Sequence, residues 1–362
     1  MKIIHKSLLL AFLLAAGLAC SRQPEYHIYM GNTHAHCNFS GDIIRVAERE
    51  NRPLDPRNDV DNNIIAGRDA GLQFYCLTDH AYLKRFKGDV WETLGEWAEK
   101  LTENGKFVAL RGFEYSRDTD TDGRGHANVY NTSQFVSADP NAYDLHAFQD
   151  WLALPENEGA LVCYNHPQKG GFNKFALYNE AEKSKFAMIE VINGNNTGVN
   201  SIYYERFLDV LEAGYRVAPV AGCDNHSVEA LPKWKARTGI AASELTPEGV
   251  INAFTQRRAY ATMDKDLKIF YTVNGQPMGS ILKPKKGNLK FDIEASTGDA
   301  VISKIDIMGE GGKMILSKEF DRSAVKWKVT VPQGQKYYFL IVYEKDVDSP
   351  VAWVAPVWTD NS

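Results

Sequence analysis

The chain has 362 residues, of which 44% are hydrophobic and 24% charged, and its net charge is −5. This length and composition are typical of a globular protein, and we expect two domains rather than one. Lysine and arginine form no block longer than a few residues, so the charge pattern gives no basis for a nucleic-acid partner.

The first twenty residues have the pattern of an export signal. Lys2 and Lys6 precede an apolar run, residues 8–18, which is short for a membrane span and ends at Ala19 and Cys20. A cysteine directly after a small residue resembles a bacterial lipoprotein signal, in which Cys20 becomes the lipidated first residue. We therefore expect an exported protein, periplasmic or anchored at the outer membrane of a bacterium through a lipid on Cys20. Plain secretion is the alternative.

Several short apolar runs end at residues of the kinds that bind metal ions. The first run, residues 26–30, is followed by His34 and His36, whose side chains point to the same side of an extended chain. One His-x-His pair is weak evidence, but the arrangement returns four times. The residues concerned are His34, His36, Asp79, His80, Glu114, His166, Asp224 and His226. The sequence therefore predicts a metal site built from strand ends.

From residue 26 to about residue 265, apolar runs of strand length alternate with segments of helical spacing. Val90, Leu94, Trp97 and Leu101, for example, fit one face of a helix that precedes a strand expected at residues 107–110. Residues 37–56 are expected to form a polar loop. Alternation of this kind predicts a parallel sheet, most simply closed as a barrel. In such barrels the loops after the strands build the active site, which is where the candidate ligands fall.

Four cysteines follow Cys20 in the chain. None has Cys-x-x-Cys spacing, and Cys76, Cys163 and Cys223 lie within or just after apolar runs, where cysteine packs as a small buried hydrophobe. We expect these three and Cys37 to be core residues. An exported location would permit a disulfide, and sequence alone does not give its pairing.

The pattern changes around residues 264–268. Short alternating runs follow, separated by Asn-Gly, Lys-Gly and Gly-Glu-Gly-Gly turns, and the segment contains no histidine. This predicts an antiparallel β-sandwich that serves as an accessory domain. Carbohydrate binding is an alternative for this segment, although its aromatic residues alternate as core residues do. The expected organisation is a signal peptide at 1–20, a metallohydrolase barrel at 21–265 and a β-sandwich at 266–362.

The order of these motifs resembles the PHP (polymerase and histidinol phosphatase) superfamily of metal-dependent phosphoesterases. The resemblance rests on His34-Ala-His36, Thr78-Asp79-His80, Gly112-Phe113-Glu114, Asn165-His166-Pro167 and Asp224-Asn225-His226. The segments Gly125-His126, Glu190-Val-Ile-Asn193-Gly194 and Arg257-Arg258-Ala-Tyr260-Ala-Thr262 are similar to the CehA and McbA branch, which includes carbamate and ester hydrolases. The likeness covers nearly all of the mature chain. It implies an α/β fold, a distorted seven-stranded (β/α)7 TIM-like barrel, that holds two or three metals.

The resemblance also implies how the ligands divide among the metals. His34, His36, Glu114 and Asp224 would hold the first metal, and Glu114 as a bridge with His126 and His166 would hold the second. Asp42, His80 and His226 would hold the third, although some family members carry histidine where Asp42 stands. Glu190 and Asn193 would support the site. Imidazole and carboxylate ligands without thiolate suit zinc, manganese or iron, and the sequence does not choose among them.

Two bridged ions supply a hydroxide nucleophile at neutral pH and stabilise the charge that develops on the attacked centre. We expect a metal-dependent hydrolase, in the first place a phosphoesterase that acts on a small phosphorylated molecule. His80 and Asp79 are the candidate catalytic groups, Asp79 either orienting a ligand or acting as a general acid. Lys84, Arg85 and Lys169 are candidates for holding the phosphate, against a role as solvated surface charges. The alternatives are a carboxyl ester or carbamate hydrolase with the same metals, and a non-catalytic binding protein.

Overall fold

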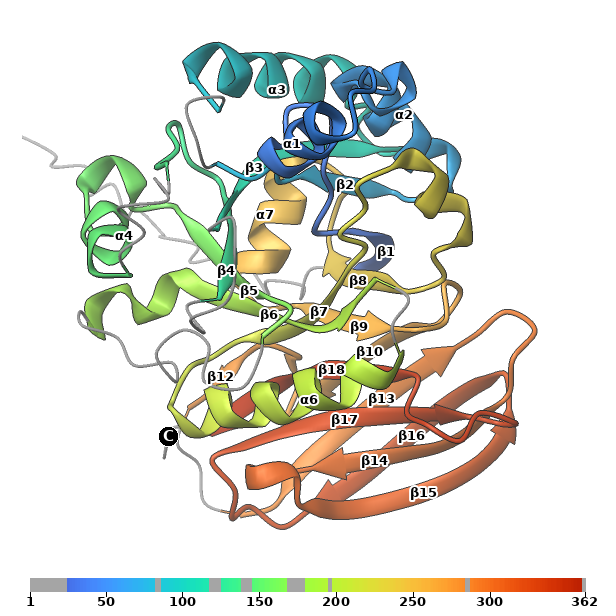
Figure 1. The fold of residues 1–362 in the computed structure, drawn as a ribbon. Coiled ribbons are helices and arrows are strands. Elements are labelled where there is room, and N and C mark those ends of the chain that lie inside the picture. Colours follow the sequence, from blue (N-terminus) through green and yellow to red (C-terminus); the bar gives the residue numbers. More distant parts are fainter. Residues whose placement is uncertain are drawn as a thin grey trace, which may run out of the picture.

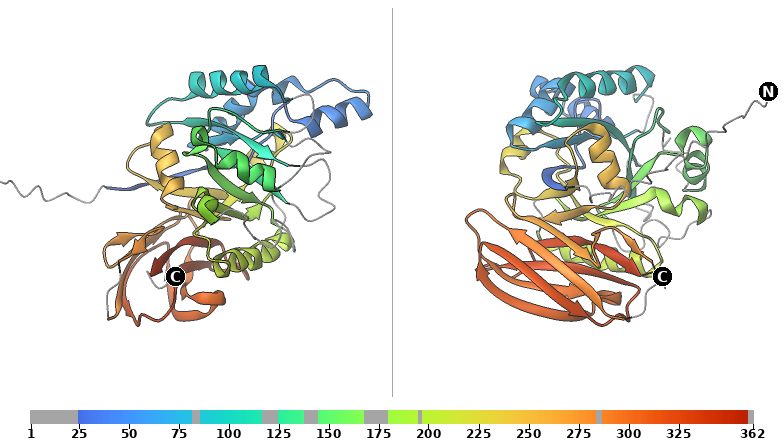
Figure 2. Two further views of the ribbon diagram at one scale, coloured as in Figure 1. Left: turned by 90° about the vertical axis from the view of Figure 1, so that its left-hand side faces the viewer. Right: turned by 180° about the vertical axis from the view of Figure 1, so that it is seen from behind.

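The computed structural model describes residues 25–81, 86–116, 125–137, 145–167, 180–194, 197–283 and 287–359. The expected signal peptide, with Cys20, lies outside these ranges. Within them, no helix combines the length and the apolar character that crossing a membrane requires. The architecture is mixed α/β: helices surround a curled sheet, and further strands stack beneath it (Figures 1 and 2).

Among the described residues, fourteen strands form one continuous sheet. Its order is β15-β14-β17-β18-β9-β8-β1-β2-β3-β4-β5-β6-β7, with β12 paired to β18. Its strands in chain order are β1 (His27–Asn32), β2 (Phe74–Leu77), β3 (Val108–Tyr115), β4 (His126–Tyr130), β5 (Leu161–Asn165), β6 (Phe186–Asn193), β7 (Ala218–Gly222), β8 (Arg237–Ala242), β9 (Ala259–Thr262), β12 (Ile281–Leu282), β14 (Ile302–Met308), β15 (Met314–Arg322), β17 (Tyr337–Glu344) and β18 (Ala352–Thr359).

The part of this sheet from β9 to β7 curls until β7 returns to β1 and β8. The Thr238 hydroxyl on β8 donates to the Ala221 carbonyl (2.9 Å) and accepts from the Ala221 N–H (2.8 Å) on β7. The Asn32 side-chain oxygen at the end of β1 accepts from the Cys223 N–H at 2.9 Å. The carboxyl ends of β1, β2 and β7 are thereby brought together around one centre.

The expectation of a parallel sheet is correct only in part. The pairs β1–β2, β2–β3, β5–β6 and β6–β7 are parallel, whereas β4 runs antiparallel to both β3 and β5, and β8 runs antiparallel to β1 and β9. Only ten residues separate Tyr115 from His126, which is shorter than the dozen or more residues that a crossover between parallel strands needs. The chain must therefore reverse direction at β4, a strand that the sequence reading did not identify.

Helices pack around the outside of the curled sheet (Figure 1). The α-helices are α1 (Gly41–Arg49), α2 (Val60–Asp69), α3 (Gly88–Leu101), α4 (Leu145–Leu152), α6 (Thr197–Glu212) and α7 (Pro247–Thr255). Short 3-10 segments are η1 (Pro56–Asn58), η2 (Pro155–Asn157), η3 (Glu180–Lys185), η4 (Val228–Lys233) and η5 (Glu310–Gly312). Helix α7 begins at Pro247 because the Thr246 hydroxyl before it accepts from the Gly249 N–H and proline suits the first helical position. The expected loop after His36 is wrong over residues 41–49, which form α1.

A second, antiparallel sheet lies in the C-terminal segment, in the order β11-β10-β13-β16. Its strands are β10 (Lys268–Val273), β11 (Gln276–Pro277), β13 (Leu289–Ser296) and β16 (Ala324–Val331). It faces β14, β17 and β18 across a shared apolar core that includes Ile293, Trp327, Leu340 and Val354. Helix α6 covers the other face of those three strands, where Phe207 and Phe339 meet at 5.6 Å.

The C-terminal segment is joined to the curled sheet through the backbone. β18 pairs with β9 on one side and with β17 on the other, so no break in the hydrogen bonding separates the two parts. The edge strand β15 was missed by the sequence reading, because most of its residues are polar and exposed and the apolar alternation is weak.

Glu344 at the end of β17 gives this junction a pH dependence. Burial first, and then the neighbouring Asp264 carboxyl, raise the pKa of Glu344 to about 7 from 4.5, so the folded protein favours the protonated form. The resulting stability is fully present below about pH 4.5 and is lost as the pH rises through 7.

We expect Glu344→Gln, whose amide can donate to Asp264 at any pH, to raise the free energy of unfolding by about 1–3 kcal/mol at pH 8 and much less at pH 5. Urea unfolding at both pH values measures this, with the exposed Glu319→Gln on β15 as control; equal stabilisation at both pH values would contradict it.

Candidate metal centre

The two histidines after β1 are held in extended chain between β2 and the segment after β7. The Thr78 N–H donates to the Ala35 carbonyl at 2.8 Å, and the His36 N–H donates to the Asn225 carbonyl at 3.0 Å. Both imidazoles consequently point to the interior of the curled sheet, as their two-residue spacing predicts, and their Nε2 atoms lie 3.1 Å apart.

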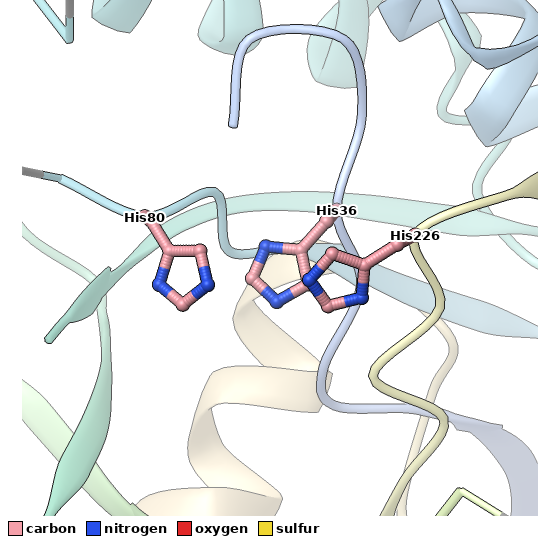
Figure 3. Close-up of side chains that lie close together, drawn as sticks. All are labelled: His36, His80 and His226. Atoms are coloured by element: carbon pink, nitrogen blue, oxygen red, sulfur yellow. The ribbon is translucent and has the colours of Figure 1, made fainter. Parts of the chain in front are cut away.

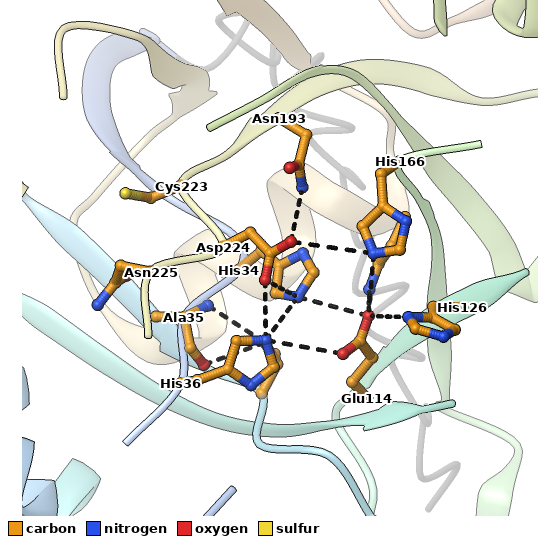
Figure 4. A network of polar contacts seen from close by, with 12 residues as sticks. His34, Ala35, His36, Glu114, His126, His166, Asn193, Cys223, Asp224 and Asn225 are labelled. Carbon is orange, nitrogen blue, oxygen red and sulfur yellow. Dashed lines mark hydrogen bonds and ion pairs between the residues drawn. The ribbon is translucent and has the colours of Figure 1, made fainter. Parts of the chain in front are cut away.

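Asp224 completes a first group of ligand-type atoms with these histidines (Figure 4). Its Oδ1 lies 3.0 Å from His36 Nε2 and 3.4 Å from His34 Nε2. The backbone at Asp224 has φ +51°, a conformation that residues other than glycine adopt only at an energetic cost. The Asp224 N–H donates to the His34 carbonyl at 2.9 Å. The strand pairing thus fixes the carboxylate over the histidine pair.

Glu114 lies at the centre of the cluster and is fully buried. Its Oε1 lies 3.5 Å from His34 Nε2, 3.2 Å from His126 Nδ1 and 3.4 Å from His166 Nε2. Its Oε2 lies 2.7 Å from His80 Nδ1 and 3.6 Å from His36 Nε2. One carboxylate therefore contacts five imidazoles, two from the segment after β1 and three from the ends of three other strands, which is the arrangement expected of a bridging ligand. Figure 4 shows its contacts with His34, His36, His126 and His166.

The remaining candidates form the outer side of the cluster. His36, His80 and His226 bring ring nitrogens within 4.8 Å of one another (Figure 3), and His226 Nε2 lies 2.5 Å from Asp42 Oδ2. Asp42 is in the first turn of α1, the helix that the sequence reading took for a loop. The grouping differs from the expected one in two details, because His36 belongs to two groups and His80 also lies with Glu114 and His126.

All nine residues expected as ligands thus come together. Seven of them lie at or just after strand ends, as the sequence reading required, whereas His126 begins the antiparallel strand β4 and Asp42 reaches the others from α1. The nine are His34, His36, Asp42, His80, Glu114, His126, His166, Asp224 and His226.

The polar atoms of this cluster fit divalent metal ions. Asp42 Oδ1, Glu114 Oε2 and both ring nitrogens of His126 are buried and have no hydrogen bond of acceptable geometry with any residue that the structure describes. Buried polar atoms are nearly always satisfied, so these need a further partner. Imidazole and carboxylate donors without thiolate are the set that divalent transition metals accept.

Charge inside the cluster is strongly coupled. Burial lowers the pKa of His34, but Asp224, Glu190 and Glu114 raise it further, and the pKa ends well above its ordinary value. Burial raises the pKa of Glu114, but His80, His34 and His126 more than reverse this and hold it well below its usual range. Burial, together with His226, lowers the pKa of His36 to about 3, so the imidazoles of the cluster do not share one protonation state.

Asp79 contacts the loop between the ligands rather than the cluster centre. Its Oδ1 accepts from the Cys37 N–H at 2.7 Å, and its Oδ2 accepts from the Cys37 thiol at 2.9 Å. Burial raises the pKa of Asp79 to about 7. Asp79 thus fixes the residue that follows His36.

The described cysteines are core residues, as expected. Cys37, Cys76, Cys163 and Cys223 are all buried and free of disulfide bonds. Lys84, Arg85 and Lys169, the residues expected to hold a phosphate, lie outside the described ranges.

Sequence reasoning missed several polar neighbours of the ligands. The Ser40 hydroxyl hydrogen-bonds His36 Nδ1 at 3.1 Å, and Asn165 Nδ2 donates to Glu114 Oε1 at 2.8 Å. Asn165 stands directly before His166 in the motif, which was the available signal. For Ser40 the signal was its position before a helix that was not recognised.

A cavity of about 990 Å³ between α3, β3 and α7 is a separate feature. None of the nine candidate ligands lines it. Its lining includes Glu99, Glu103 and Glu248, and nothing in the structure indicates an occupant for it.

Comparisons with known proteins give weak likenesses. No protein-family model matches the chain. An uncharacterised protein of Chlamydia pneumoniae is 21% identical, with 81% of this chain covering 53% of that protein, so the chain spans about half of its length. A two-domain Bacteroides vulgatus protein containing a predicted PHP-like metal-dependent phosphoesterase has a TM-score of 0.47 at 16% identity over 91% of this chain and 95% of its own. A lesion-specific endonuclease of Pyrococcus furiosus has a TM-score of 0.39 at 9% identity over 63% and 56%.

Proposed function

We propose that the protein is a metal-dependent hydrolase and, more specifically, a phosphoesterase of the PHP type. The observation that carries the proposal is the buried Glu114 carboxylate with five imidazoles around it, because a structural ion pair does not require so many ligand-type atoms at one point. The names of the two solved structures mention a phosphoesterase and an endonuclease, but their similarity to this chain is too low to support the proposal.

The residues divide the work as follows. His34, His36, Glu114, Asp224, His126 and His166 would hold two divalent ions, and Asp42, His80 and His226 would hold a third. Bound ions of this kind supply a water of lowered pKa and Lewis acidity toward the attacked group. Glu114 would keep the ions together because its two oxygens face different imidazoles. The backbone pairing of residues 35 and 225 keeps the ligand loops in place without any substrate.

A phosphoester is the substrate class that this site fits best. A phosphoryl group offers two or three oxygens to a cluster of cations, and three groups of ligand-type side chains meet at this site. A carboxyl ester or carbamate needs fewer cationic contacts, and the similarity of residues 190–194 and 257–262 to the CehA and McbA branch favours it as the second candidate.

The test is a substrate panel on protein whose metal content is known. We expect at least two transition-metal ions per chain by elemental analysis after growth with zinc, manganese or iron, and metal-dependent release of phosphate or alcohol from phosphomonoesters or phosphodiesters. Treatment with a chelator removes the activity, and added metal restores it. Saturable turnover of a carboxyl ester or carbamate with no turnover of any phosphoester would select the second candidate. Less than one ion per chain would reject both.

A further inference from the structure

Glu190 and Asn193 on β6 both point into the site although they are three residues apart. In a regular strand, residues at an odd separation lie on opposite faces. The pairing of β6 with β7 explains the exception, because Glu190 pairs with Val220 and Ile192 pairs with Ala221, which leaves Val191 as an extra residue. This β-bulge turns Asn193 to the same side as Glu190, and bulges often re-aim side chains in this way beside active sites.

Glu190 contacts two candidate ligands directly. Its Oε1 accepts from the ring nitrogen Nδ1 of His34 at 2.9 Å, and its Oε2 accepts from the backbone N–H of His166 at 2.7 Å. Glu190 is completely buried. A carboxylate can only accept, so His34 must carry a proton on Nδ1, and its Nε2 is then the nitrogen that faces Asp224 and Glu114.

Asn193 extends this contact to a third ligand. Its Nδ2 donates to Glu190 Oε2 at 2.9 Å. The same Nδ2 donates to Asp224 Oδ2 at 3.3 Å (Figure 4). His166 has φ +27° and Asp224 has φ +51°, both unusual for residues other than glycine. The two β6 side chains thus hold strained ligand positions on two different segments.

We infer that Glu190 and Asn193, presented together by the bulge at Val191, are positioning residues that set the ring orientation of His34 and fix His166 and Asp224 for metal binding. The inference rests on the proposed metal-dependent function, because it concerns residues that hold the ligands of that site. It also assigns a role to the bulge, which places Asn193 beside Glu190 so that the pair contacts ligands on different segments.

The experiment measures zinc affinity and the His34 ring proton in Glu190→Gln. The amide of glutamine keeps one accepting oxygen and replaces the other oxygen by an NH2 group that only donates, so it cannot accept from His34, His166 and Asn193 together. Either the NH2 group faces another N–H donor, or it donates to His34 Nδ1 and the ring proton moves to Nε2. We expect the zinc dissociation constant, measured by competition with a chelator, to rise about 10- to 100-fold. We also expect the zinc-loaded parent, but not the variant, to show a slowly exchanging Nδ1–H signal by ¹⁵N-edited NMR, identified by its loss in His34→Gln.

The control is Glu344→Gln, a buried glutamate on β17 that contacts none of the ligands. It should keep the parental zinc affinity and the parental signal. Should Glu190→Gln not fold, Asn193→Ala decides, since it removes the bridge to Asp224 and is expected to weaken zinc binding at least about threefold. Parental affinity and an unchanged Nδ1–H signal in the folded variants would overturn the inference. Absence of zinc binding by the parent would instead overturn the proposed function.

Discussion

Replacing Glu114 by glutamine is expected to remove both the bound metal and the activity. The side chain keeps its size, and the amide oxygen can still accept from Asn165 Nδ2. The new NH2 group, however, faces His80 Nδ1 in place of an oxygen that now lies 2.7 Å away. Groups that stand behind a ligand already contribute roughly 10- to 100-fold, so the loss of a bridging carboxylate should reduce kcat/KM by more than that.

The measurement is kcat/KM on the best substrate of the panel, together with metal content by elemental analysis. Glu344→Gln again serves as the matched control, because it makes the same chemical change at a buried glutamate on β17 whose charged neighbour is Asp264. A Glu114→Gln protein that keeps two ions per chain and more than a tenth of the parental rate would show that Glu114 does not bridge.

Gly222→Ala is expected to disturb the fold and the site together. A Cβ at this position would lie 1.8 Å from Glu190 Oε1 and 2.8 Å from the His34 Cβ, so Glu190 must give up its hydrogen bonds or the β7 backbone must shift. Overpacking of this kind costs typically about 1–3 kcal/mol. Because the displaced group is the carboxylate that contacts His34 and His166, we expect weaker zinc binding as well.

Gly88→Ala is the control, since a Cβ at Gly88, at the start of α3, meets nothing within 4 Å. Urea unfolding and the zinc dissociation constant are measured for both variants. If Gly222→Ala matches Gly88→Ala in both quantities, the close packing of Gly222 against Glu190 is not a constraint on the protein.

Most of the site was predictable because it follows from a period of two and from one rule about strands. His34 and His36 share a face in extended chain, and the carboxyl ends of neighbouring parallel strands meet, so ligands at successive strand ends converge. Neither step needs knowledge of tertiary contacts. Asp42 and His126 reached the list only through the family resemblance, because Asp42 lies on α1 and His126 is the first residue of the antiparallel strand β4.

The rest depended on contacts that a local pattern does not contain. The side that Asn193 faces is set by the bulge at Val191, which exists only in the pairing with β7. The antiparallel β4 follows from the short connection to β3, and β15 is an edge strand with little apolar alternation. Helix α1, by contrast, did leave a signal, since Ile43 and Ala47 are four residues apart on its buried side.

The place of β18 in the main sheet has a consequence for how the chain reaches its folded state. β9 is complete about 90 residues before β18 is made, yet β18 is its neighbour and also the partner of β17. At synthesis rates of about 5–20 residues per second, the edge of β9 has no β18 to pair with for at least roughly 5–20 s. During that time the growing polypeptide presents an unpaired strand that can associate with other chains. The sheet closes only when residues 352–359 arrive, so translation, rather than the intrinsic speed of strand pairing, sets the earliest moment of completion.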